Sequence, residues 1–257
     1  MKLSIPVLTV IAVCAAAVFS CKRDFPVAAA TTGTGSNAFI QIIQASPNFR
    51  AIFKVPDSLN VYLGSVRVNA GFLQYGTAYP TTGTYAAVQP GAQEIRITEN
   101  TAIDPDSTVL SFTRTLVAGN YYTLVITDSI KSTRDSSKIW LQDNYPKPGA
   151  GPGYFYLRLM HAVMDGIADT IDLYSPRRNQ VLFSKVRVDS TTPFTAFPMI
   201  LNSQDTLYVR KTGTGTILAK ALTLTFGDQQ FFTAYYIGDT AANPAGKTRA
   251  LAIGRNK

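Results

Sequence analysis

Few residues of this chain are of the types that carry out acid–base or nucleophilic chemistry. The 257 residues include one histidine, His161. A Ser-His-Asp hydrolase needs a histidine as proton carrier, and no Gly-x-Ser-x-Gly motif accompanies His161. The corresponding position of an earlier, similar stretch is Gln44. Because this position accepts an imidazole or an amide, we expect its side chain to form a hydrogen bond at a strand end. We therefore predict a protein without catalysis, and a hydrolase is a remote alternative.

Metal ligands are also sparse. Zinc sites draw on several His or Cys side chains, which this chain does not offer. Oxygen ligands for calcium occur in two clusters, neither with EF-hand spacing: Asp104 with Asp106, and Asp165 with Asp169 and Asp172. Asp also caps ordinary turns through its own side chain. We therefore predict no metal and no cofactor, and keep the five aspartates as weak calcium candidates.

The N-terminal residues have the layout of a secretion signal. Lys2 precedes an apolar run over residues 3–19, and Ser20 stands just before Cys21. This stretch resembles the lipobox of bacterial lipoproteins, although Val18 and Phe19 depart from its preferred residues. The resemblance implies a signal peptide over residues 1–20 and a lipid on the Cys21 thiol. The other cysteine, Cys14, would leave with the signal peptide, so the mature chain could form no internal disulfide.

Export restricts the partners and the location. Residues 21–37 are rich in Ala, Thr and Gly and predict a flexible tether from the lipidated Cys21. The lipid implies a membrane as partner and the bacterial cell envelope as location, and residues 22–24 favour the outer membrane by analogy. Nucleic acid is a poor partner for an exported protein. The net charge of +8 falls to +7 without Lys2, with zero on residues 38–144 and +5 on residues 154–257.

The mature chain contains an internal repeat, in which one pattern of predicted strands occurs twice. Residues 39–45 match residues 156–162 in character, and residues 108–128 match residues 216–239. Alternating apolar and polar residues indicate strands, and about seven strands per unit are typical of an immunoglobulin-like sandwich. We therefore predict an all-β protein of two tandem immunoglobulin-like antiparallel β-sandwich domains. Their predicted ranges are 38–144 and 154–257, joined by a Pro- and Gly-rich linker at 145–153 that serves as a hinge or a stiff spacer.

The repeats resemble a bacterial family catalogued as domain of unknown function 4397. Residues 44–47 (Gln-Ala-Ser-Pro) stand where the family has His-Ala-Ser-Pro, and residues 59–62 follow as its next strand. Residues 89–91 and 118–123 match its turns, while the second unit keeps only His161 and Ala162 of the first motif. The resemblance implies extracytoplasmic β-sandwich repeats on lipoproteins and no particular activity.

Adjacent aromatic residues on the strands leave two interpretations open. Neighbouring residues of a strand point to opposite faces, so one ring of each pair should lie in the core. The other ring either covers the sheet or forms a platform for sugar rings, for which the candidates are Tyr122, Phe232, Tyr235 and Tyr236.

The function predicted from these features is binding or structural display at the cell envelope. The partner could be a glycan, an envelope polymer or another surface protein. The alternative is a carbohydrate-binding accessory component of a glycan-uptake system.

Overall fold

The computed structural model is all β in the part of the chain that it describes. It describes residues 36–47, 58–81, 84–99, 108–127, 138–146, 151–163, 169–200, 204–238 and 247–257. The predicted signal peptide, Cys21 and most of the predicted tether lie outside these ranges. None of the described residues forms a helix long and apolar enough to cross a membrane.

Ten strands belong to residues 38–142 and nine to residues 154–255. The first ten are β1 Ala38–Gln44, β2 Ser58–Leu63, β3 Val66–Arg67, β4 Leu73–Gln74, β5 Ala78–Tyr79, β6 Ala86–Val88, β7 Gly91–Glu99, β8 Thr108–Leu116, β9 Tyr121–Ile126 and β10 Lys138–Gln142. The next nine are β11 Tyr154–His161, β12 Thr170–Ser175, β13 Gln180–Arg187, β14 Ser190–Thr191, β15 Thr195–Pro198, β16 Asp205–Lys211, β17 Ile217–Leu224, β18 Phe231–Ile237 and β19 Ala250–Arg255.

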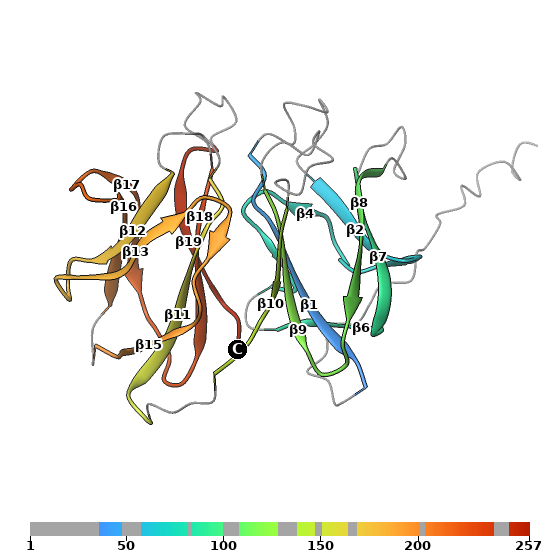
Figure 1. Cartoon of the computed structure of the whole chain (residues 1–257), viewed down its shortest axis with the longest axis horizontal. Helices are drawn as coiled ribbons and strands as arrows, with labels where there is room; N and C mark the ends of the chain where they lie inside the picture. The colour runs from blue at the N-terminus through green and yellow to red at the C-terminus, as the bar shows by residue number, and fades with distance from the viewer. Residues whose placement is uncertain are drawn as a thin grey trace, which may run out of the picture.

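These strands form four sheets, arranged as four layers (Figure 1). The first outer sheet has the order β3-β2-β7-β8, and the first inner sheet has the order β10-β9-β1-β5. The second inner sheet has the order β14-β11-β18-β19, and the second outer sheet has the order β13-β12-β16-β17. Each outer sheet packs on its inner sheet over one apolar core, so each half of the chain forms a sandwich.

The two sandwiches have similar strand orders. In each, the first strand runs parallel to the last but one, β1 to β9 and β11 to β18. The other described strand pairs are antiparallel, so these two pairings depart from the predicted antiparallel sandwich. The described pairs all join strands of the same half. The domain limits at residues 144 and 154 stay a prediction.

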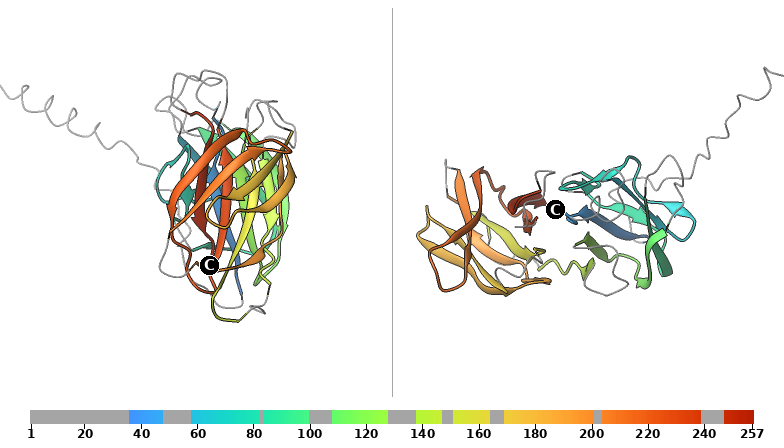
Figure 2. Two further views of the ribbon diagram at one scale, coloured as in Figure 1. Left: turned by 90° about the vertical axis from the view of Figure 1, so that its left-hand side faces the viewer. Right: turned by 90° about the horizontal axis from the view of Figure 1, so that it is seen from above.

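The two inner sheets face each other and are in contact (Figure 2). Strands β1 and β18 are buried on both faces, because one face lies in the sandwich core and the other lies against the opposite sandwich. Figure 2, from above, shows the two halves side by side with β1 and β19 at their contact. We call this contact between the two inner sheets the junction.

Candidate functional site at the junction of the two sandwiches

An ion pair lies at the centre of the junction. Arg158 on β11 donates from Nη1 to Oδ1 of Asp143 over 2.5 Å, and the two side chains are 5% and 0% exposed. Asp143 follows β10, so the pair joins the two sandwiches. Burial is the largest single effect and would lower the pKa of the guanidinium, but the charge of Asp143, the phenols of Tyr235 and Tyr85 and the hydrogen bond to Asp143 together outweigh it, and the pKa of Arg158 is raised. Arg158 therefore stays charged, and Asp143 is its counter-ion.

Hydroxyl groups satisfy the remaining capacity of this pair. Oδ2 of Asp143 accepts hydrogen bonds from Thr123 Oγ1 at 2.6 Å and Tyr85 Oη at 3.0 Å. Nε of Arg158 donates to Thr233 Oγ1 at 2.8 Å. A buried charge is tolerated when it is both paired and hydrogen-bonded, and here both partners meet that condition.

The polar network continues across the junction through Asn256. Its Oδ1 accepts from Thr233 Oγ1 at 2.6 Å, and its Nδ2 donates to Gln41 Oε1 at 3.2 Å and to Tyr85 Oη at 3.3 Å. Thr233 and Asn256 belong to the second sandwich, whereas Gln41 and Tyr85 belong to the first. The polar residues of the alternating strands, which would point to solvent in an isolated sandwich, thus hydrogen-bond to the other half.

Aromatic rings close one side of the network around Tyr145, the first residue of the predicted linker. Its ring stacks on Phe194 at 5.3 Å between centroids and meets Phe231 edge-on at 4.9 Å. Its hydroxyl is hydrogen-bonded to that of Tyr85. Burial is the main cause that raises the pKa of both phenols above the usual range. The charge of Asp143 adds to this effect on Tyr85, and the neighbouring Tyr85 adds to it on Tyr145. Both phenols therefore stay neutral, and Tyr145 ties the start of the linker to both sandwiches.

An apolar contact lies beside the polar network. It consists of buried residues from both halves: Ile43, Ala45, Val125, Ile139, Met160, Ala162, Tyr235 and Ile237. The stretch that carries the family resemblance contributes to it, since Ala45 and Ser46 are fully buried. Lys247 of the second half, itself buried, donates from Nζ to the carbonyl oxygen of Pro47 at 3.2 Å. The Gln-Ala-Ser-Pro motif therefore helps to hold the second sandwich in place.

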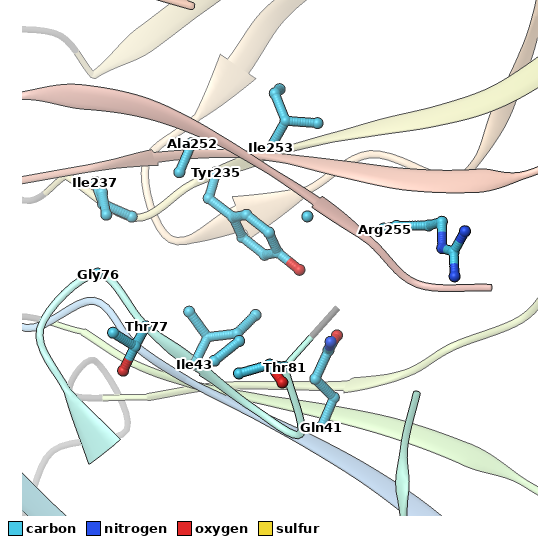
Figure 3. Close-up of a pocket in the computed structure, with 12 residues that line it drawn as sticks. Gln41, Ile43, Gly76, Thr77, Thr81, Tyr235, Ile237, Ala252, Ile253 and Arg255 are labelled. Atoms are coloured by element: carbon cyan, nitrogen blue, oxygen red, sulfur yellow. The ribbon is translucent and has the colours of Figure 1, made fainter. Parts of the chain in front are cut away.

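A cleft of about 290 Å³ opens at this contact between the halves. Figure 3 shows the Tyr235 ring projecting toward Ile43, with Arg255 at one side. Burial raises the pKa of Tyr235, which keeps this phenol neutral. The size is at the lower end for ligand pockets, and the walls are mostly apolar. The cleft could hold a small apolar group, but its lining offers no group that would exchange a proton near neutral pH.

The four aromatic residues predicted as an exposed platform are all buried. Tyr122, Phe232 and Tyr236 lie in the two sandwich cores, and Tyr235 lies in the junction, with 1–7% of each side chain exposed. An open platform at these residues is therefore wrong. Sequence reasoning assumed that one face of each strand meets solvent, whereas the inner sheets bury both faces.

The single histidine lies within the protein and not at a surface site. His161 is 1% exposed, its Nδ1 is 3.4 Å from the carbonyl oxygen of Val186, and its ring lies 5.3 Å from that of Tyr236. Gln44, at the equivalent strand end, accepts a hydrogen bond from the backbone of Ser46. Both placements fit the interpretation of a hydrogen bond at a strand end.

The calcium candidates are only partly described. Asp104, Asp106 and Asp165 lie outside the described residues. Asp169 is exposed, and Asp172 accepts hydrogen bonds from the backbone of Lys185 and Gly213 and from Thr212. Within the described ranges, no group of three His, Cys, Asp or Glu residues is arranged to hold a metal ion.

Residues 38–165 match the model of the family "Domain of unknown function (DUF4397)", and this part of the chain belongs to that family. The match covers the first sandwich and continues through β11. A comparison with solved structures matches the chain to the fimbrial anchor protein Mfa2 from Porphyromonas gingivalis, at 10% identity and a TM-score of 0.25, over 86% of this chain and 97% of the other. A likeness this distant carries no inference about function. No curated protein matches the chain.

Proposed function

We propose that the protein is a non-catalytic lipoprotein of the bacterial cell envelope that binds or displays through two joined sandwiches. Lipid on Cys21 would hold the chain at a membrane, most simply the outer membrane, and residues 22–37 would give the sandwiches reach. Two or more acyl chains hold a protein far more durably than one.

The observation that supports this proposal best is the junction. The buried ion pair of Arg158 and Asp143 joins the two sandwiches and is shielded from solvent. Joining the inner sheets also leaves the outer sheets and the loops at the ends of the sandwiches as the surfaces for a partner.

Lipid attachment is tested by labelling the native host with radioactive palmitate. We expect label on the wild-type protein and on Cys14→Ser, and none on Cys21→Ser. The Cys14→Ser variant is the matched control, because it removes a thiol from the signal peptide and leaves the attachment residue intact. Label on Cys21→Ser, or none on the wild type, would contradict the anchor.

Display is tested by adding a protease to intact cells. Wild-type protein on an exposed outer face should be degraded, whereas protein on an inner face should survive until the cells are opened. Recovery of all the protein in the cytosolic fraction would overturn the proposed location.

A further inference from the structure

The second outer sheet carries an outward face of aromatic and basic side chains. Leu173 on β12 and Val209 on β16 are fully buried in the core of the second sandwich. Because neighbours along a strand point to opposite faces, Tyr174, Tyr208 and Arg210 point away from that core. These three side chains are partly exposed. The face lies on the side of the molecule opposite the junction (Figure 1).

Strand register places four side chains in one row across this sheet. Tyr174 pairs with Tyr208, Tyr174 also pairs with Val181 on β13, and Tyr208 pairs with Lys220 on β17. Val181 is 45% exposed, and Lys220 is exposed. Neighbouring strands are about 4.8 Å apart, so the row is about 14 Å long. A flat, elongated row of this kind suits an extended chain lying across the strands.

Arg210 lies flat on this row, opposite Asp172 of the neighbouring strand. Its Cζ is 3.4 Å from the centre of the Tyr174 ring, and the Tyr174 hydroxyl donates to Asn179 Oδ1 at 2.8 Å. Its Nε has no hydrogen-bond partner in the structure. Its cross-strand neighbour Asp172 gives its carboxylate to the three donors of nearby turns. Tyr174 therefore orients the Arg210 guanidinium, while the hydrogen bonds that Asp172 accepts come from the turns and not from Arg210.

The first sandwich offers an internal comparison. Its Tyr62 corresponds to Tyr174, and Arg96 lies over the Tyr62 ring at 5.0 Å. Tyr62 is only 2% exposed, so this ring cannot take part in a platform. Residues 38–144 also carry no net charge, while residues 154–257 carry +5. The second sandwich therefore has both partly exposed rings on its outer sheet and an excess of positive charge.

We propose that this face, the outer-sheet platform (Val181, Tyr174, Tyr208, Arg210 and Lys220), binds a polysaccharide that carries carboxylates. The apolar C–H face of a sugar ring packs on Tyr208, and carboxylates pair with the fixed guanidinium of Arg210 and with Lys220. A folded protein partner fits less well, since a stable interface buries about 800 Å² on each side around an apolar centre. This inference rests on the proposed binding function and adds the class of ligand.

The test measures binding of the full-length protein, purified in detergent, to polygalacturonate and to uncharged dextran. We expect binding to polygalacturonate that weakens as salt is added, and no binding to dextran. Tyr208→Ala and Arg210→Gln should each weaken binding at least tenfold. Tyr208→Phe should bind within twofold of wild type, because it keeps the ring.

The matched control is Arg114→Gln. Arg114 also lies near an aromatic ring, with its Cζ 5.3 Å from the centre of Phe112, but on the first outer sheet. The Arg114→Gln variant should bind polygalacturonate within twofold of wild type. If Arg114→Gln weakens binding of polygalacturonate as much as Arg210→Gln does, binding depends on the overall positive charge and the platform is overturned. Equal binding to dextran would overturn the acidic ligand class, and no binding to either polymer would overturn the inference. Palmitate labelling is independent of these outcomes, so the lipoprotein proposal fails or survives separately.

Discussion

Asp143→Ala should lower the free energy of unfolding more than other single substitutions at the junction. The change leaves the Arg158 guanidinium buried and charged without its counter-ion, and it removes the acceptor of Thr123 and Tyr85. Removing one partner of a buried pair costs about 3–5 kcal/mol. The side chains are 5% and 0% exposed, so solvent screening does not reduce this figure. We expect the free energy of unfolding to fall by at least about 3 kcal/mol.

Urea unfolding of the chain without residues 1–21 measures this loss, provided that the dependence on urea keeps its slope. Asp169→Ala is the matched control, since Asp169 is exposed and surface changes cost within about 0.5 kcal/mol. The double variant Asp143→Leu with Arg158→Met removes both charges and should lose less than Asp143→Ala alone. A loss below about 1 kcal/mol for Asp143→Ala, or a double variant as unstable as the sum of its two single changes, would refute the reasoning.

Other predictions concern pH, backbone and lipid. Burial raises the pKa of Tyr145 above its ordinary value of 10.0, so the folded state holds this proton more tightly. Its contribution to stability is complete below pH 10 and falls above it, by up to about 1.4 kcal/mol per pH unit; Tyr145→Phe should flatten this fall in urea titrations. Gly238 has a φ of +111°, and a Cβ there would be 2.5 Å from the carbonyl oxygen of Thr248. Gly238→Ala should therefore lower the melting temperature by several degrees, whereas Gly71→Ala, with no atom within 4 Å of its Cβ, should leave it unchanged. Cys21→Ser should release the protein from the membrane fraction on cell fractionation.

The strands and their repetition could be predicted because the residue pattern is local. Apolar alternation over residues 39–45 and 156–162 gave β1 and β11 at nearly their observed limits. Strand β13 could not be predicted in this way, because its pairing with β12 shifts register and Lys185 adopts a φ of +54°. An irregular strand of this kind breaks the alternation that reveals regular ones.

The junction could not be predicted, because it depends on the other half of the chain. Polar residues such as Gln41, Thr123 and Arg158 alternate with apolar ones, which normally indicates a solvent-facing side. In the structure these residues are 0–4% exposed, and the other sandwich covers them. One signal was present in β18, whose seven residues (Phe-Phe-Thr-Ala-Tyr-Tyr-Ile) are almost all apolar. Such a run is typical of a strand buried on both faces.

Differential scanning calorimetry of the chain without residues 1–21 tests the central claim, that the two sandwiches form one body. If Arg158, Asp143 and the apolar contact couple the halves, both should unfold in a single transition whose calorimetric and van't Hoff enthalpies agree. Two separate transitions, or a calorimetric enthalpy about twice the van't Hoff value, would show that the sandwiches unfold independently and would contradict this account.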